Sequence, residues 1–221
     1  APQIAKVTPE RVRDELFRML EGAQPETSLR LMEHLGALKI VLPEMDALRG
    51  AQQPPPHVLD VWEHTLGVMQ RLAVVLRLLA GEYDPDAAAN LGAGLLTVRL
   101  GRFRQQVEQH LAAQLNPDRS LRSLYFLAAL YHDAGKPQAR THEQDGQIHF
   151  YEHERYSARL FSARAHALRL SSQEIERLGT IIRHHMRPLW LANSEGLPSR
   201  RAIYRLFRDT GPAGVDICLF S

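Results

Sequence analysis

The sequence contains one cysteine, Cys218, among 221 residues. A single cysteine cannot form a disulfide within the chain, which favours a reducing compartment, and we expect a cytoplasmic protein. Lysine is also scarce, because only three of the 27 basic residues are lysines and the rest are arginines. No apolar stretch is long enough to cross a membrane, since Asp60, Glu63 and Arg71 interrupt the longest candidate. We therefore expect no membrane partner.

The sequence shows almost none of the alternation of apolar and polar residues that is typical of half-buried strands. Apolar residues instead recur every three or four positions, as in the stretch from Val58 to Leu79. A content of 44% hydrophobic and 24% charged residues is ordinary for a globular protein with a core. These observations predict an all-α fold. The net charge of +2 is too small to indicate nucleic-acid binding by itself.

A proline-rich segment, Gln52-Gln-Pro-Pro-Pro-His57, divides the chain into two parts. We predict a small helical unit over residues 1–50, whose first helix begins at Thr8-Pro9-Glu10. A larger helical domain is predicted over residues 51–221. The chain stops inside an apolar run, residues 215–220, so we expect it to be a piece of a longer protein.

The most informative motif is Tyr131-His132-Asp133-Ala134-Gly135-Lys136-Pro137, which follows an apolar helical run over residues 121–130. Neighbouring His and Asp side chains can bind one cation through an imidazole nitrogen and a carboxylate oxygen. Lys136 would place a positive charge beside that cation, suited to a phosphate oxygen. The alternative explanation is a helix end whose polar cap happens to be His-Asp, and the other histidines decide between the two.

Three further histidines fall on or beside the apolar faces of predicted helices: His64, His153 and His185. His153 belongs to a helix that we expect to open at His149, and His185, rather than His184, continues the apolar spacing of its helix. Histidines that point inward from several helices of a bundle are a familiar way to build a metal site. Nitrogen and oxygen ligands without a thiolate suit Mn, Fe, Ni, Co or Zn better than a structural zinc site.

A metal ion held in this way acidifies a bound water and polarises a phosphoryl oxygen. Lys136 would stabilise negative charge on the non-bridging oxygens. The pattern therefore predicts hydrolysis of a phosphomonoester or a phosphodiester with a bound divalent ion, and Mg²⁺ is kept among the candidate metals.

The C-terminal part of the chain is rich in arginine, with seven arginines against three acids from Arg177 onward. One explanation is a charged outer helix face, and the other is contact with the phosphates of a substrate or an RNA. The candidates for phosphate or RNA contact are Arg183, Arg187, Arg201 and Arg205, with Arg200 and Arg208 nearby.

The motifs, taken in order, resemble the HD-domain superfamily of metal-dependent phosphohydrolases. They are Val-Trp-Glu-His64-Thr, His132-Asp133-Ala-Gly-Lys136-Pro, His149-Phe-Tyr-Glu-His153 and Ile-Ile-Arg-His184-His185-Met. More narrowly, the chain looks like the HD region of bacterial tRNA nucleotidyltransferase and poly(A) polymerase-like proteins. Residues 6–45 resemble the helical neck that precedes that region. The resemblance implies an HD-domain helical bundle behind a neck-like segment.

The resemblance also implies roles for individual residues. His64, His132 and Asp133 match the first metal ligands of the family, and His153 and His185 match the ligands of a second metal, with His184 as a competitor. Lys136 is expected near the substrate phosphate, so Lys136 and Asp133 are the candidate catalytic residues. The family closes its site with a further Asp on the last helix. We find none up to Ser221, and Asp216 resembles an acid just upstream of that position.

Two functions follow. The first is a metal-dependent phosphohydrolase with a nucleotide or RNA-end substrate, and the alternative is the RNA-binding body of a tRNA nucleotidyltransferase-like protein with a vestigial HD site. The resembled proteins carry a nucleotidyltransferase head domain before the neck, with paired acids behind a Gly-Ser turn. Asp84-Pro-Asp86 offers paired acids without that turn, so we expect no nucleotide addition by this chain alone. A head domain would lie upstream in the native protein.

Overall fold

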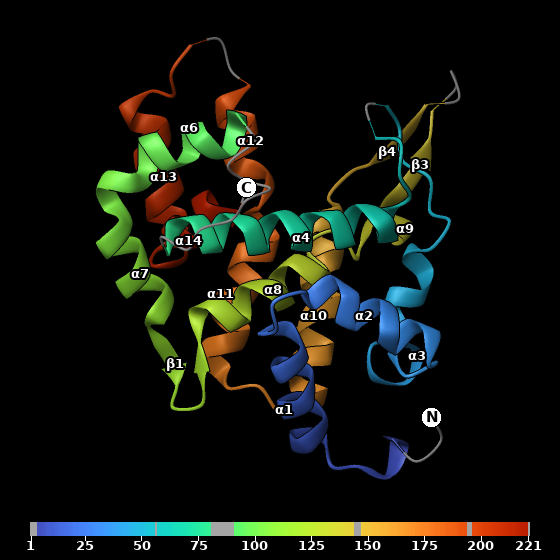
Figure 1. Ribbon diagram of the computed structural model, residues 1–221. Coiled ribbons are helices and arrows are strands. Elements are labelled where there is room, and N and C mark those ends of the chain that lie inside the picture. The colour runs from blue at the N-terminus through green and yellow to red at the C-terminus, as the bar shows by residue number, and fades with distance from the viewer. Residues whose placement is uncertain (1–3, 56, 81–90, 144–146, 194–195, 221) are drawn as a thin grey trace.

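The computed structural model describes residues 4–55, 57–80, 91–143, 147–193 and 196–220. These residues fold into helices joined by short connections and two small hairpins (Figure 1), which confirms the predicted all-α class. Asp84-Pro-Asp86 lies outside the described residues. Within the described ranges, no helix is both long enough and apolar enough to span a bilayer.

Residues 4–50 form short helices. In order, they are η1 (Ile4–Lys6), α1 (Pro9–Leu20), α2 (Pro25–His34), α3 (Leu38–Val41) and η2 (Pro43–Leu48). α1 begins with a proline at its first position, where the missing N–H costs no hydrogen bond. Between α2 and α3 the backbone turns at Gly36 with a φ of 68°, a conformation that glycine adopts readily.

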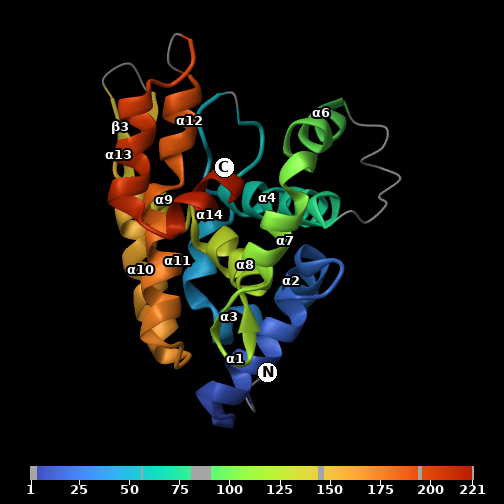
Figure 2. The ribbon, with the colours of Figure 1, turned by 90° about the vertical axis from the view of Figure 1, so that its left-hand side faces the viewer.

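The remaining helices form the body of the molecule. They are α4 (Val61–Leu79), α6 (Leu91–Leu100), η3 (Gly101–Phe103), α7 (Arg104–Ala112), α8 (Leu121–Tyr131), α9 (Lys136–Ala139), α10 (His153–Ala167), α11 (Ser172–His184), α12 (Met186–Ala192), α13 (Arg200–Thr210) and α14 (Ala213–Phe220). α8 lies at the centre (Figures 1 and 2), with α4, α10, α11, α1 and α7 packed around it. All residues of α8 except Arg122 are buried, so its C-terminal end delivers the His-Asp motif into the interior.

Two antiparallel hairpins interrupt the helices: β1 (Gln114–Asn116) with β2 (Arg119–Ser120), and β3 (Arg140–His142) with β4 (Ile148–Phe150). The second hairpin corrects one expectation. The helix predicted to open at His149 begins only at His153, after Glu152 in a left-handed conformation with a φ of 58°. His149 pairs with Thr141 across the hairpin instead, so His149 and His153 do not share a helix face.

The N-terminal helices and the body share one hydrophobic core. Its buried members include Leu20 and Leu48 from the first part and Trp62 and Leu124 from the second. Polar contacts cross the same interface, because the Glu44 carboxylate accepts two hydrogen bonds from Arg164, at 2.9 and 2.8 Å, and one from the Tyr131 hydroxyl. The division into residues 1–50 and 51–221 stays a prediction from the sequence, and packing is continuous across it.

Candidate metal centre

The His-Asp motif lies in a tight turn between α8 and α9. The N–H of Gly135 donates to the Ser157 Oγ at 2.8 Å, which fastens the turn to the first turns of α10. A Cβ at position 135 would lie 2.4 Å from the His153 carbonyl oxygen and 2.5 Å from the Ser157 nitrogen. Only glycine permits this approach, and the approach brings the start of α10 close to Asp133.

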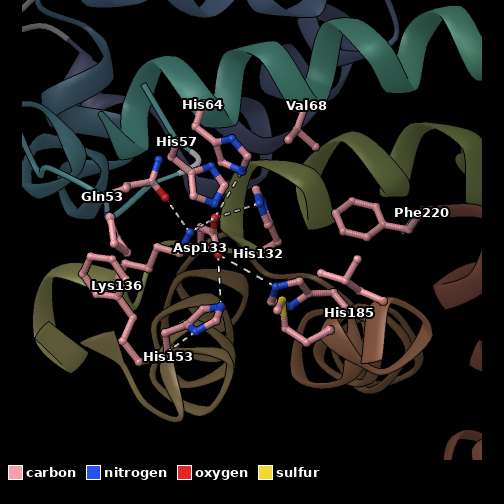
Figure 3. A pocket seen from close by; sticks show the side chains of 14 residues that line it. Gln53, His57, His64, Val68, His132, Asp133, Lys136, His153, His185 and Phe220 are labelled. Atoms are coloured by element: carbon pink, nitrogen blue, oxygen red, sulfur yellow. Dashed lines mark hydrogen bonds and ion pairs between the residues drawn. The ribbon is translucent and has the colours of Figure 1, made fainter. Parts of the chain in front are cut away.

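Asp133 is the centre of a cluster of four histidines (Figure 3). Its Oδ2 atom lies 3.1 Å from the His132 Nε2 and 3.4 Å from the His64 Nε2. Its Oδ1 atom lies 3.1 Å from the His153 Nε2 and 3.8 Å from the His185 Nε2. His64, His132 and Asp133 form one group whose ligand atoms all lie within 4.8 Å, and Asp133, His153 and His185 form a second. The structure therefore brings together five of the residues predicted as ligands, from helices far apart in the sequence.

The hydrogen bonds of the histidines fix which ring nitrogen faces the cluster. The Nδ1 atoms of His132, His153 and His185 lie 2.7, 3.0 and 2.7 Å from the backbone carbonyl oxygen three residues earlier. A carbonyl oxygen only accepts, so each Nδ1 carries the hydrogen and each Nε2 faces Asp133, where a neutral ring presents its lone pair. This is the arrangement in which histidine binds a metal while its second nitrogen is held in place.

The donor set fits a divalent ion. The Nε2 of His153 is buried and makes no hydrogen bond among the described residues, although a carboxylate oxygen of Asp133 lies 3.1 Å away. Two acceptor atoms that face each other at this distance repel unless a cation or a proton lies between them. The cluster therefore has the geometry and the chemistry of a site that could hold a metal ion.

The protonation states agree with this interpretation. Burial raises the pKa of Asp133, but the surrounding histidines, His132 above all, outweigh burial and hold that pKa well below its usual range. Burial, assisted by His132, lowers the pKa of His185 to about 3. At neutral pH the cluster therefore contains an ionised carboxylate and a neutral His185, which are the forms that bind a metal.

Lys136 lies beside the cluster, in the same pocket. Its Nζ atom is 2.7 Å from the Asp133 Oδ2 and 2.6 Å from the Gln53 Oε1, and 5.6 Å from the centre of the Phe150 ring. The pocket has a volume of about 420 Å³, and the residues that line it besides these and the histidine cluster are Pro54, His57, Val68, Met186, Leu189 and Phe220. Sequence analysis did not find Gln53, His57 or Phe220.

His184 stays outside both groups of ligands. Adjacent helical residues differ in direction by about 100°, so His184 and His185 cannot both face Asp133. Burial lowers the pKa of His184, and Arg187 and Arg183 lower it further, which places His184 among arginines rather than around the carboxylate. Of the two histidines, the structure places His185 beside Asp133.

The predicted phosphate-contacting arginines lie on the surface, outside the pocket. Arg201 and Arg205 are exposed on α13, and Arg183 is exposed on α11. Arg187 pairs with Asp209 at 3.2 Å. Tyr204, 64% exposed, lies on the same helix as Arg201 and Arg205, so this surface combines positive charge with an aromatic ring.

Asp216 is not part of the metal cluster. It is fully buried between α14 and its neighbours, where it accepts a hydrogen bond from the Tyr125 hydroxyl and pairs with Arg177 and His110. These contacts anchor α14, whose far end places Phe220 against the rings of His132 and His185, with centroid distances of 5.8 and 6.5 Å.

Comparisons with known proteins agree with this architecture. The HD domain family matches residues 61–209, and a family described as the probable RNA and SrmB-binding site of polymerase A matches residues 1–49. The CC-adding tRNA nucleotidyltransferase of Thermus thermophilus is 30% identical over 199 residues, which are 90% of this chain and 34% of that protein. The A-adding tRNA nucleotidyltransferase of Deinococcus radiodurans is 27% identical over 197 residues, 89% of this chain and 35% of that protein.

Shorter similarities point the same way. A multifunctional CCA protein of Vibrio campbellii is 40% identical over 74 residues, 32% of this chain and 18% of that protein. The chain spans about a third of the length of the two tRNA nucleotidyltransferases that it matches over most of its own length. Because the HD match covers more than half of the chain and contains the whole His-Asp cluster, the chain belongs to the HD-domain family.

Proposed function

We propose that this chain is the RNA-contacting neck and HD region of a tRNA nucleotidyltransferase-like protein. The observation that carries the proposal is the similarity to two tRNA nucleotidyltransferases over nine-tenths of the chain, neck and HD region together. The match of residues 1–49 to an RNA-binding family supports it. The comparisons thus favour what was the alternative in the sequence analysis. Nucleotide addition itself belongs, in this proposal, to a head domain elsewhere in the native protein.

The surface of α13 offers suitable contacts for RNA. Arginine binds phosphate oxygens through several donors at once, and an exposed aromatic ring can stack on an unpaired base. Arg201 and Arg205 are one helical turn apart, with Tyr204 between them in sequence and exposed beside them. We propose that they contact phosphates and that Tyr204 supports a base.

The test is the affinity of the chain for tRNA, measured by fluorescence anisotropy at several salt concentrations. Binding should weaken steeply with salt, and Arg201→Ala with Arg205→Ala should reduce the slope of log K against log salt by about two. Arg155→Ala is the matched control, because Arg155 is exposed on α10 and pairs with Glu152. Affinity that is absent, or indifferent to salt, would contradict the proposal.

A second candidate function is metal-dependent hydrolysis of a phosphate ester, such as a nucleotide or an RNA end. The observation that favours it is the pair of ligand groups that share Asp133, next to Lys136. His64, His132 and Asp133 would hold one ion and Asp133, His153 and His185 a second, from among Mn, Fe, Ni, Co, Zn and Mg. A bound ion would supply an acidified water and polarise the phosphoryl oxygen. Lys136 would bind a non-bridging oxygen and stabilise its charge.

Hydrolysis of p-nitrophenyl phosphate and of its bis-ester, after loading with each metal in turn, tests the second candidate. Asp133→Asn keeps the size of the side chain but removes the charge that both ligand groups share, so turnover should fall to background. Full turnover of the Asp133→Asn variant would exclude this site as the source of the activity. Tyr204→Ala, far from the cluster in sequence and exposed, should leave turnover unchanged.

A further inference from the structure

The segment between the two family matches forms part of the pocket. Residues 50–60 lie between the ranges 1–49 and 61–209, yet Gln53, Pro54 and His57 line the pocket around Asp133. We call residues 51–55 and 57–60 the bridging loop. The sequence predicted a linker over residues 52–57, and neither family match assigns this loop a role.

Hydrogen bonds close the bridging loop at its base. The Oδ1 of Asp60 accepts the N–H of Glu63 at 2.8 Å and so caps α4, while its Oδ2 accepts the N–H of Gly50 at 2.7 Å. The N–H of Val61 donates to the Ala51 carbonyl oxygen at 3.1 Å. The loop therefore starts and ends at one fixed point, the first turn of the helix that carries His64.

Within the loop, both ends of the Gln53 amide are held. Its Nε2 donates to the Leu59 carbonyl oxygen at 3.1 Å, so its Oε1 must face the other way, towards the Lys136 Nζ at 2.6 Å (Figure 3). Gln53 and Lys136 are only 8% and 7% exposed, so neither side chain exchanges this bond easily for water. The opposite amide orientation would place an NH₂ group against the ammonium and a carbonyl against a carbonyl.

The ammonium of Lys136 has three donors, and two of them bind Gln53 and Asp133. Lysine carries its charge on four flexible methylene groups, and holding it in one place requires partners that restrict it. With these two partners in place, one donor is left for an anionic oxygen in the pocket that Lys136 lines.

We propose that Gln53 is a positioning residue, which holds the Lys136 ammonium beside Asp133 so that its remaining donor meets a phosphate oxygen. The proposal rests on the second candidate function for the nature of the ligand. The geometry that it requires, an ammonium fixed between Asp133 and the bridging loop, is a property of the chain alone.

The scarcity of lysine gives a direct test. Lys6 and Lys39 are exposed and Lys136 is buried, so a chain labelled with ¹⁵N-lysine should show one slowly exchanging ammonium signal, which Lys136→Arg removes and thereby assigns. Gln53→Ala should shift this signal and speed its exchange with water about tenfold, the factor expected for one charge-assisted hydrogen bond. Gln52→Ala, at an exposed neighbouring glutamine, is the matched control and should change neither.

A conservative variant separates positioning from general stability. Gln53→Glu keeps an oxygen acceptor for Lys136, so the slow ammonium signal should persist, although the bond to the Leu59 carbonyl oxygen is lost. An exchange rate that Gln53→Ala leaves unchanged, or that Gln53→Glu raises as much as Gln53→Ala does, would overturn the proposal. Thermal melts of all variants show whether each is folded.

Titration of the manganese-loaded chain with inorganic phosphate tests whether the positioned Lys136 ammonium binds a phosphate oxygen. Gln53→Ala should weaken phosphate binding about tenfold, and Gln53→Ala combined with Lys136→Met should be no weaker than Lys136→Met alone, because the glutamine acts through the lysine. Independent, additive losses would overturn the proposal. If the unaltered chain binds no phosphate, the second candidate function fails, and the lysine signal alone decides whether Gln53 positions Lys136.

Discussion

His184 and His185 are neighbours in the sequence, but only His185 faces Asp133. We predict that His185→Ala lowers the number of metal ions per chain, measured by inductively coupled plasma mass spectrometry after dialysis. His184→Ala should give the same metal content as the unaltered chain, because its side chain lies among arginines. Loss of metal in His184→Ala with retention in His185→Ala would show that the two histidines had been assigned the wrong way round.

A second prediction concerns the glycine of the motif. Gly135→Ala should lower the free energy of unfolding by about 3 kcal/mol, because the new methyl group meets backbone atoms that cannot move aside. Gly179→Ala is the matched control in α11, where a Cβ would meet no atom within 4 Å. It should raise the free energy of unfolding by about 1 kcal/mol, since alanine favours helix. Urea unfolding measures both, and a tolerated Gly135→Ala would contradict the close packing.

The sequence was enough to predict the residues whose helical spacing or motif marks them. His64 and His185 stood out because they continue apolar stripes, and His132 with Asp133 because they are adjacent. Gln53 and His57 gave no such signal, since a proline-rich loop has no periodicity, and the path of a loop depends on where its ends are tied. Phe220 belonged to the apolar run over residues 215–220, which does not indicate a pocket residue.

At the scale of elements, the capping box of α11 shows that a local motif can predict where a helix begins but cannot predict which distant residues the motif contacts. Ser171 and Glu174 cap the helix reciprocally, and a serine followed three residues later by a glutamate is typical of such a cap. The same Glu174 is fully buried and also binds Arg119, with a contact of 2.6 Å to its Nε, and Asn116 at 2.7 Å. These partners lie more than fifty residues away and cannot be inferred from the motif.

Glu174→Gln should therefore cost more than the loss of a helix cap. At neutral pH we expect a loss of about 3 kcal/mol in the free energy of unfolding, because the buried Arg119 keeps only the more distant and exposed Asp14, at 3.7 Å, as an acidic partner. Glu176→Gln, two residues further along the same helix, is the control and should change this free energy by less than about 0.5 kcal/mol. Guanidinium unfolding measures the difference, and equal effects of the two variants would contradict a buried ion pair.

The same pair sets a dependence on pH. Burial raises the pKa of Glu174, but Arg119 and the Ser171 backbone outweigh burial, so the pKa in the folded chain lies below its ordinary value of 4.5. The contribution of Glu174 to stability is then fully present above the unfolded pKa and is lost as the pH falls through the folded pKa. The difference between the unaltered chain and Glu174→Gln should shrink in acid below about pH 4.5. A difference that is constant down to pH 2 would contradict the lowered pKa.

The hairpin before α10 shows why some elements escaped prediction. β3 and β4 have three residues each, too few for an alternating pattern to stand out. His149 was therefore assigned to the helix that follows. The left-handed residue Glu152 marks the true boundary, and a glutamate in that conformation carries no sequence signal.

At the scale of the whole molecule, the neck-like segment and the HD region should unfold together, because they share one core and the Glu44 contacts. Trp62 reports on this interface, since its Nε1 donates to the Glu33 Oε2 at 3.0 Å. We predict one urea transition, with the same midpoint by tryptophan fluorescence and by far-ultraviolet circular dichroism. Trp190→Phe removes the exposed tryptophan and leaves Trp62 as the probe.

Glu44→Ala should move that single transition to lower urea, because Arg164 and Tyr131 lose their common partner. We expect the free energy of unfolding to fall by about 3 kcal/mol. A fluorescence transition that precedes the loss of helix would show instead that the two parts separate first.

The all-α class was predictable from periodicity, but the shared core was not, because a linker and a continuous packed interface can have the same local sequence.

The position of Lys136 also has a practical consequence. Beyond residue 50 it is the only lysine, and it is buried against Gln53 and Asp133, while Lys6 and Lys39 are exposed in the first fifty residues. Reagents that acylate lysine side chains would therefore modify this chain through its N-terminal part and spare the HD region. A dye, a biotin or a surface coupled in this way would be attached through the first fifty residues, and Lys136 in the pocket would stay unmodified.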